Sequence, residues 1–327
     1  MHALRTTLAL SLVLALPLDA QQRPDTVSLR FNWPVGMTAI VEQEFTRVNQ
    51  TSTRNDSITV TSSYRLRVLK HPRGRLVVAD SFRMGTVAGV PVEGAAAGNS
   101  DAQRMLSLVG NLQPSFVVSP DGAFLEVARI DNLKSSLDSM MRMLTREMSG
   151  GAPPELRAFL DRATSPEVLN AGAAEQWNAV AGTWVGADWE LGESYVTSIE
   201  EPIPMFPGFN MPMEYEFSAS ERIPCTKKSG GKTCVRLEMY SAPDTAQLRK
   251  VVGEVMKQLA PELKDAASVL QNMRMLNEIE LVAEPGTLRP HSITRIKRVI
   301  VNTAEKGKAP EVNRRVDVRT ARYRYDP

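Results

Sequence analysis

Residue types that could do chemistry are scarce in this sequence, and its two cysteines are the most informative of them. Cys225 and Cys234 enclose the polar stretch TKKSGGKT, and the 327 residues contain no other cysteine. The spacing is too wide for the C-x-x-C motif of thioredoxin-type redox sites, and two cysteines alone do not complete a zinc site. We therefore predict a structural disulfide between Cys225 and Cys234 across the neck of a β-hairpin, with a redox site as the alternative.

The histidines and paired carboxylates offer little for catalysis. His71 lies in KHPRGR and His291 in RPHS, and neither belongs to an H-x-x-x-H or H-E-x-x-H pattern. The sequence has no G-x-S-x-G elbow, no Walker loop and no G-x-G-x-x-G. Glu200 and Glu201 are adjacent, so in a strand they point to opposite faces. We expect a protein that is not an enzyme and has no cofactor or metal. The alternative is an enzyme in which such carboxylates act in acid–base catalysis.

The N-terminus has the layout of a secretory signal peptide. Arg5 is followed by an apolar run from Leu8 to Leu18 and by the small residue Ala20. The run is too short to cross a bilayer as a stable helix. We predict that residues 1–20 are a signal peptide and that residues 21–327 form one exported domain, periplasmic or secreted, with no transmembrane segment. Export would place the cysteines in an oxidising compartment, where they pair.

Composition narrows the class of protein further. Hydrophobic residues make up 43% of the chain, which is typical of a globular protein. The formal net charge is +2, so the sequence lacks the strong basic excess of a nucleic-acid-binding protein, and we expect no nucleic-acid partner. Aromatic residues are only 6%, whereas methionine occurs fifteen times. The basic excess is local, because residues 289–327 hold eleven Lys or Arg against four Asp or Glu.

Two blocks of alternating, Thr- and Val-rich sequence predict long antiparallel strands. The first block covers residues 26–84 and continues in FVVSPDGAFLEV, a hairpin around a Pro-Asp-Gly turn. The second runs from Trp184 to the C-terminal RRVDVRTARYRY. ELVAEPGTLRPHS in the second block echoes the Pro-Asp-Gly hairpin of the first. This echo predicts two half-repeats that meet near residues 184–200.

Amphipathic segments between these blocks predict helices. Apolar residues at spacings of three and four, and prolines in a first helical turn, mark them, and Ser165 is an N-cap candidate. The predicted helices cover residues 131–148, 153–163, 165–180 and 244–273, the last with a kink or break at Pro261. The sequence thus predicts an α+β protein: a large, curved, half-barrel-like antiparallel sheet with amphipathic helices packed on one face.

Three motifs in this arrangement carry a resemblance to known proteins. The opening LRFNWPVGMTAIVEQEF, the Pro-Asp-Gly hairpin and the later GTWVGADWELGESY resemble an uncharacterised family of bacterial exported proteins and lipoproteins. Long antiparallel strands covered by amphipathic helices are, more distantly, similar to the half-barrel carriers of lipids and lipoproteins in cell envelopes. That likeness implies an apolar cavity between sheet and helices and no chemistry. The resemblance assigns no functional residues, and the chain lacks the lipobox cysteine of many relatives.

Methionine and phenylalanine gather in two segments. PIPMFPGFNMPM, residues 202–213, is too rich in proline for a helix or a central strand, and the helix predicted over 131–148 carries four methionines. Methionine adapts to varied apolar partners, but it also fills gaps in a core, and both interpretations remain open. The candidate ligand-binding residues are Met205, Phe206, Phe209, Met211, Met140, Met141 and Leu144.

The C-terminal strands interleave cations with apolar residues. In ITRIKRVIV and VRTARYRY the cations recur at strand period. One face can meet anionic lipid head groups or polyanionic sugar, or it is the solvated face of an antiparallel sheet. We expect a non-catalytic protein that binds or carries an apolar, lipid-like ligand in the cell envelope. The alternative is an envelope protein–protein interaction module without a small-molecule ligand.

Overall fold

The structure is a computed structural model of the whole chain. It describes residues 25–92, 108–110, 112–146, 154–203, 209–226, 231–259, 270–303 and 311–325. The predicted signal peptide, residues 1–20, lies outside the described residues.

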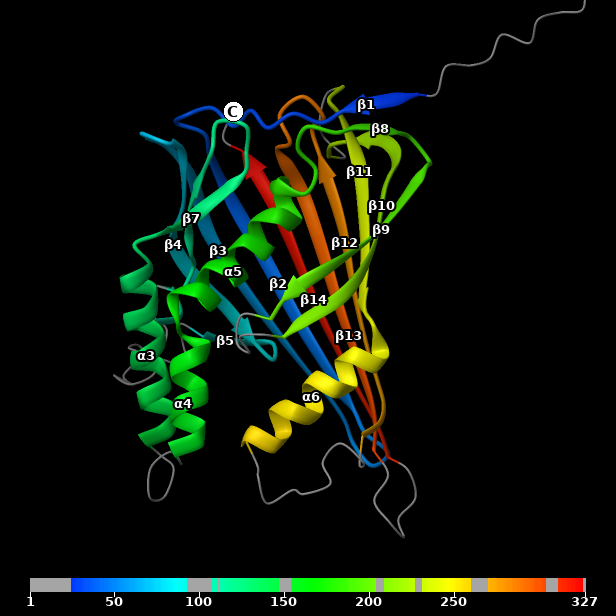
Figure 1. Cartoon of the computed structure of the whole chain (residues 1–327). Helices are drawn as coiled ribbons and strands as arrows, with labels where there is room; N and C mark the ends of the chain where they lie inside the picture. The colour runs from blue at the N-terminus through cyan, green and yellow to red at the C-terminus, as the bar shows by residue number, and fades with distance from the viewer. Residues whose placement is uncertain are drawn as a thin grey trace, which may run out of the picture.

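One antiparallel sheet of twelve strands dominates the molecule (Figure 1). Its strands are β2 (Thr38–Gln50), β3 (Asn55–His71), β4 (Gly74–Val87), β5 (Val90–Pro91), β6 (Ser115–Val118), β7 (Phe124–Ala128), β9 (Ser194–Pro202), β10 (Asn210–Pro224), β11 (Thr233–Pro243), β12 (Leu270–Ala283), β13 (Pro290–Thr303) and β14 (Glu311–Tyr325). In space they follow the order β7-β6-β4-β3-β2-β14-β13-β12-β11-β10-β9, and β5 pairs with β4.

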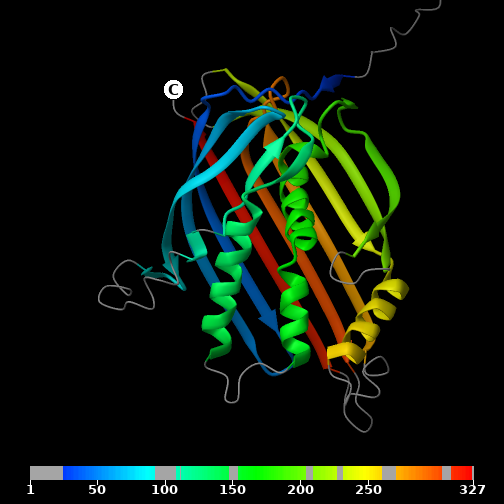
Figure 2. The same cartoon turned by 60° about the vertical axis from the view of Figure 1, so that its left-hand side comes forward.

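The two predicted strand blocks join into this one sheet through the pairing of β2 with the C-terminal β14. The alternation that predicted strands is visible in β14, where Ala321 and Tyr323 are buried while Arg322 and Arg324 are exposed. The sheet is strongly curved (Figure 2), and β7 and β9 are its two edge strands, so it is not closed. The prediction of a large, curved antiparallel sheet is confirmed. The two half-repeats stay a prediction.

The predicted disulfide-closed hairpin is present. β10 and β11 pair antiparallel from Met213↔Pro243 to Pro224↔Thr233. Cys225 directly follows β10 and is bonded to Cys234, which lies at the start of β11 opposite Ile223. Both cysteines are buried and pack against Val282. A disulfide fits an oxidising compartment.

We expect the double variant Cys225→Ser/Cys234→Ser to keep its fold but to lose about 2–3 kcal/mol of unfolding free energy, because the closed loop restricts the unfolded chain. Urea titration of both proteins measures the difference. Peptide mapping without reductant checks the premise. Two free, alkylatable thiols in protein recovered from an oxidising compartment would contradict it.

The helices lie on the concave side of the sheet (Figures 1 and 2). They are α3 (Ile130–Arg146), α4 (Pro154–Ala163), α5 (Pro166–Trp177), the π-helical turn η1 (Asn178–Gly182) and α6 (Thr245–Leu259). Ser165 caps α5 as predicted, since its hydroxyl accepts from Val168 N at 3.4 Å. The helix predicted over 244–273 is wrong at its C-terminal end. Residues from Leu270 belong to β12, where Met273 pairs with Val301, because this stretch is taken up by the sheet ladder.

The main core lies at one end of the curved sheet, where the N-terminal segment crosses it. Strand β1 (Thr26–Ser28) pairs with β8 (Asp188–Glu190). Leu29 N then donates to Ala187 O, while Arg30 N and Asn32 N donate to Pro285 O and Thr287 O. This alternation turns Leu29, Phe31 and Trp33 inward, and all three are buried. We call this region, which also holds Trp177 and Trp184, the closed end.

An ion-pair cluster stabilises the inner face away from the closed end. Asp317 of β14 accepts from Arg47 Nε at 2.7 Å and from Arg315 Nη2 at 2.6 Å. Burial alone would raise the pKa of Asp317, but the hydrogen bonds and charges of Arg315 and Arg47 outweigh it and lower the pKa to about 2. The carboxylate form is therefore the stabilising one.

We expect Asp317→Asn to lower the free energy of unfolding at neutral pH by up to about 2 kcal/mol. A carboxyl whose pKa is depressed by folding contributes fully above its unfolded pKa and loses that contribution as the pH falls through the folded one. The difference between variant and wild type should therefore shrink between about pH 4 and pH 2. Urea titrations across that range measure it, and a pH-independent difference would contradict the assignment.

Candidate binding cavity

A cavity of about 440 Å³ lies between the inner face of the sheet and the α5–η1 segment. Its floor comes from β2, β3, β4, β13 and β14, and its roof from Phe116, Trp177, Val180 and the residues Val109, Leu112, Gln113 and Pro114. Ligand pockets commonly fall between about 300 and 1,000 Å³. Two larger hollows of about 570 and 670 Å³ adjoin this cavity, and more than half of the side chains that line each of them are polar. The 440 Å³ cavity is therefore the candidate for an apolar ligand.

Strand register explains why the floor is apolar near the closed end. Directly opposed residues of an antiparallel sheet point to the same face. The ladder pairs Ile293 with Ala321 on the neighbouring strands β13 and β14. It also pairs Leu66 with Ala79 on β3 and β4. All four line the cavity.

Aromatic rings form the end wall of the cavity. The ring of Trp177 lies 5.3 Å from that of Trp33, 5.6 Å from Phe31 and 5.8 Å from Phe116, measured between centroids. Trp177 Nε1 donates to Gly122 O at 2.7 Å, and Trp33 Nε1 donates to Leu288 O at 3.1 Å. These hydrogen bonds satisfy the polar atoms of both buried indoles, so the wall presents only apolar surface.

The lining also contains polar side chains, among them Glu44 and two arginines. Arg295 of β13 pairs directly with Arg319 of β14, which in turn pairs with Phe45 of β2. All three line the cavity, and the guanidinium of Arg319 lies 5.3 Å from the centroid of the Phe45 ring. Arg295 is half-buried and Arg319 is exposed. Within the described ranges neither arginine forms an ion pair.

Arg295 is the deeper of the two cations. Its Nη2 donates to Gln176 O at 2.7 Å, in the last turn of α5. Burial lowers the pKa of Arg295, and Glu175 opposes this electrostatically without coming within ion-pair distance. Arginine nevertheless remains charged in proteins. The cavity therefore contains a positive charge whose hydrogen bond, among the described residues, goes to a backbone carbonyl.

Two tyrosines lie beside Arg295 on the cavity floor. Tyr64 and Tyr323 both line the cavity, and their hydroxyls have no hydrogen-bond partner in the part of the chain that the structure describes. Burial raises the pKa of Tyr323 to about 12 and that of Tyr64 well above its usual value. Both therefore stay protonated and can donate hydrogen bonds at neutral pH.

The candidate ligand residues from the sequence fall into two separate places. Phe209 and Met211 pack with Leu248 and Val251 of α6. Met140 and Met141 are half-buried on α3, which contacts α5, and Leu144 lies in the last turn of α3. Figures 1 and 2 place α3 and β10 on opposite sides of the molecule. Met205 and Phe206 lie outside the described residues.

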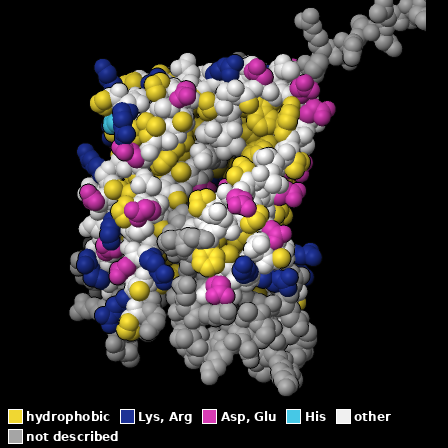
Figure 3. All heavy atoms as spheres, viewed as in Figure 1, with side chains coloured by type: hydrophobic (Ala, Val, Ile, Leu, Met, Phe, Trp, Pro, Cys, Tyr) yellow, Lys and Arg dark blue, Asp and Glu magenta, His cyan; other side chains and the backbone are white. Residues whose placement is uncertain are grey.

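None of the described side chains in that set lines the 440 Å³ cavity. Sequence reasoning missed the cavity residues because they come from strands far apart in the chain. One signal did exist: ITRIKRVIV and VRTARYRY interleave cations with apolar residues, and Arg295 and Arg319 among these cations line the cavity. Figure 3 shows the helix-bearing side hollowed between α5 and β9, with hydrophobic side chains around the hollow.

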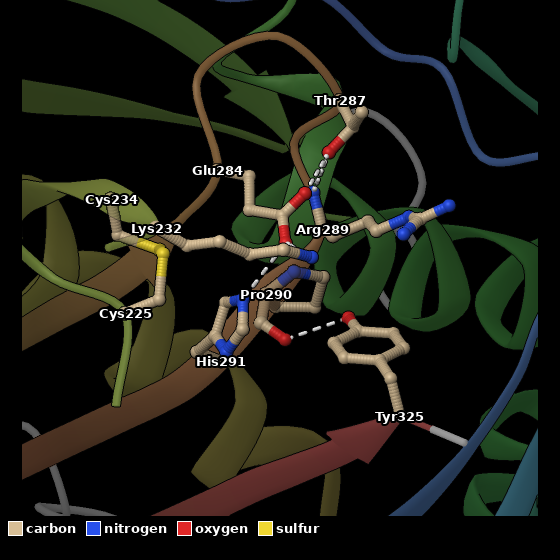
Figure 4. The surroundings of a disulfide bond; sticks show 9 residues. All are labelled: Cys225, Lys232, Cys234, Glu284, Thr287, Arg289, Pro290, His291 and Tyr325. Carbon is tan, nitrogen blue, oxygen red and sulfur yellow. Dashed lines mark hydrogen bonds and ion pairs between the residues drawn. A yellow bond between two sulfur atoms is a disulfide. The ribbon is translucent and has the colours of Figure 1, made fainter. Parts of the chain in front are cut away.

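The surroundings of the disulfide form a polar cluster at the closed end (Figure 4). Glu284 accepts from Thr287 Oγ1 at 2.9 Å, and His291 Nε2 lies 3.2 Å from Glu284 Oε1. Burial would raise the pKa of Glu284, but the hydrogen bonds of His291 and Thr287 lower it overall. The two sulfur atoms and a nitrogen of His291 lie within 4.8 Å of one another. Because both sulfurs are in the disulfide, they are not thiolate ligands for a metal.

The remaining chemistry-bearing residues are held in local contacts. His71 Nδ1 accepts from Arg73 N at 3.3 Å, in the β3–β4 turn. Glu201 accepts from the hydroxyl of Tyr215, whereas Glu200 is exposed on the opposite face of β9. Burial, followed by the bond to Glu201, raises the pKa of Tyr215. The two carboxylates therefore do not face one another.

No protein-family model matches the sequence, and a search of curated proteins finds no match. Among solved structures, one of lipid–protein interactions in lipovitellin is similar over 90% of this chain, with 7% sequence identity and a TM-score of 0.39. The chain spans only 26% of that lipovitellin chain. An outer membrane channel from Pseudomonas putida F1 is similar over 90% of this chain and 98% of its own, with 9% identity and a TM-score of 0.16. Neither similarity establishes function.

The length and hydropathy of the helices bear on whether they could cross a membrane. Within the described residues, no helix combines the length and the apolar character needed to cross a bilayer.

Proposed function

We propose that this protein is a non-catalytic, exported carrier that binds an apolar, lipid-like ligand in the cavity between its curved sheet and the α5–η1 segment. The observation that carries the proposal is the 440 Å³ cavity, whose wall is built from Trp33, Trp177 and Phe116. Its volume lies within the range of ligand pockets, and most of the side chains that line it are apolar, which suits an apolar ligand. The disulfide and the predicted signal peptide support a periplasmic or secreted location.

The energetics favour a ligand with an alkyl chain. Transfer of each methylene from water into apolar surroundings is worth about 0.8 kcal/mol. Micromolar affinity corresponds to about 8 kcal/mol, so a chain of moderate length reaches it after the entropic costs of binding. The volume of the cavity suits one such chain rather than a bulky multi-chain lipid.

Titration of the delipidated protein with an environment-sensitive fluorescent fatty-acid probe tests this proposal. We expect saturable binding at micromolar concentration, with one site per chain, and displacement by an unlabelled fatty acid. Signal that rises linearly without saturation, or that unlabelled fatty acid does not displace, would count against a carrier.

One observation favours the alternative, an envelope protein–protein interaction module. The edge strand β9 exposes Tyr195, Val196 and Ile199, with Val196 65% and Ile199 50% accessible. An exposed apolar edge strand is a template for strand addition by a partner. This alternative predicts that Val196→Lys abolishes capture of a protein partner from an envelope extract while leaving probe binding unchanged. Equal capture by variant and wild type would exclude β9 as the docking strand.

A further inference from the structure

We propose that Arg295, Arg319, Tyr64 and Tyr323 bind the anionic head group of a single-chain amphiphile such as a fatty acid. The inference rests on the carrier function proposed above and names the chemistry of the ligand. It goes beyond an apolar cavity, because an apolar ligand alone has no use for charged donors in the lining. Four observations about these residues support it.

The two arginines are an energetically unfavourable pair without a ligand. They stand directly opposite one another on β13 and β14 and share the inner face. Like charges at directly opposed positions destabilise a sheet. Elsewhere on the same face Asp317 compensates Arg47 and Arg315, yet in the described chain no carboxylate pairs with Arg295 or Arg319. An anion between the two guanidiniums would remove the repulsion.

Arg295, Arg319, Tyr64 and Tyr323 all offer hydrogen-bond donors, although Glu44 also lines the cavity. A guanidinium offers only N–H groups, and the pair Arg295–Arg319 presents two of them. The Tyr64 and Tyr323 hydroxyls have no described partner, and their raised pKa values keep the proton in place. Carboxylates and phosphates accept several hydrogen bonds at once, and arginine donates to them in a bidentate way. The set is therefore complementary to an oxyanion.

The position of the arginines along the sheet fits an amphiphile. On the closed-end side, the neighbouring inner-face pair is Ile293 with Ala321, and on the other side it is Lys297 with Asp317. The arginine pair thus stands at the border between an apolar and a charged part of the inner sheet face. A ligand whose head group lies at this border extends its alkyl chain toward the Trp33–Trp177 wall.

The cation–π contact holds the outer arginine over the cavity. Arg319 lies over the Phe45 ring, which Arg47 also approaches at 5.3 Å. Stacking on an aromatic ring restricts the conformations of an arginine side chain before any ligand binds. Restraint before binding lowers the entropic cost of ligand capture. Arg319 is therefore prepared to contact a head group although it is exposed.

Isothermal titration calorimetry of four proteins with three ligands tests the inference. The proteins are wild type, Arg319→Met, the double variant Arg295→Met/Arg319→Met, and Arg322→Met, a control on the same strand whose side chain belongs to the opposite face. The ligands are laurate, dodecanol and inorganic phosphate. The melting temperature of each protein is measured alongside the titrations. If the double variant does not fold, the single variant Arg319→Met still tests the inference.

We expect wild type to bind laurate at least tenfold more tightly than dodecanol and to bind phosphate at least a hundredfold more weakly than laurate. Arg319→Met should lose at least threefold, and the double variant at least tenfold, in laurate affinity. Dodecanol affinity should be unchanged in all four proteins, and Arg322→Met should match wild type. Tight phosphate binding would instead assign the site to a free anion and overturn the inference.

The failures of the two proposals are distinguishable. Equal affinities of wild type for laurate and dodecanol, or equal losses of both ligands in the arginine variants, would overturn the head-group site while leaving the carrier function intact. Absence of binding for both alkyl ligands would overturn the carrier function itself.

Discussion

Replacement of Trp177 by alanine is expected to lower the free energy of unfolding by about 3–5 kcal/mol, the range for truncating a large buried aromatic residue. The indole is 2% exposed and contacts Phe31, Trp33 and Phe116. Its removal loses these contacts, leaves Gly122 O without its indole donor, and enlarges the existing cavity. A loss of this size is a large fraction of the total unfolding free energy of a typical domain, about 5–15 kcal/mol.

Urea unfolding followed by circular dichroism measures this loss, with two controls. Trp177→Phe keeps most of the packing and should lose less, because it removes only the hydrogen bond and part of the ring. Tyr195→Ala alters an aromatic residue that is 41% exposed and should change the unfolding free energy by less than about 1 kcal/mol. A Trp177→Ala protein as stable as wild type would show that the closed end is not the main core.

The second large effect is on binding. We expect Ala79→Trp to reduce affinity for a fatty-acid probe at least tenfold. Ala79 lies on the inner face of β4, opposite Leu66 of β3, and lines the 440 Å³ cavity. An indole at this position would occupy space that the alkyl chain needs. Because the ring can extend into an existing hollow, the cost in stability should be small compared with overpacking a filled core.

Val78→Trp is the matched control for this experiment. Val78 is adjacent to Ala79 on β4 and therefore points to the opposite face of the sheet. Probe titration should find wild-type affinity for Val78→Trp and a large loss for Ala79→Trp, with similar melting temperatures. Equal affinities in the two variants would place the ligand outside this cavity.

Much of the fold is encoded in local pattern. Alternation predicted the strands, and the C-terminal strands show why it works, since Ala321 and Tyr323 face the core while Arg322 and Arg324 face solvent. The cysteine spacing predicted the β10–β11 disulfide. The segment 244–273 failed at its end because apolar residues around Leu270 fit a helix as well as a strand, and pairing with β13 decided the outcome.

The candidate site was much less predictable. The candidate ligand residues Phe209 and Met211 pack with Leu248 and Val251 of α6 and do not line the 440 Å³ cavity. The cavity depends on pairing β13 with β14 and β14 with β2, and β2 lies at the other end of the chain. Periodicity shows which residues of one strand share a face. It does not show which strands are neighbours, so the meeting of Arg295, Arg319 and Phe45 was not accessible from the sequence.

The most direct test of the carrier function is native mass spectrometry of the exported protein, purified without detergent, followed by extraction and identification of what it holds. We predict a mass increment of one single-chain, anionic amphiphile per protein chain, which Ala79→Trp loses and Val78→Trp retains. Wild-type protein that carries no small molecule, and that takes up none after incubation with fatty acids, would contradict the account.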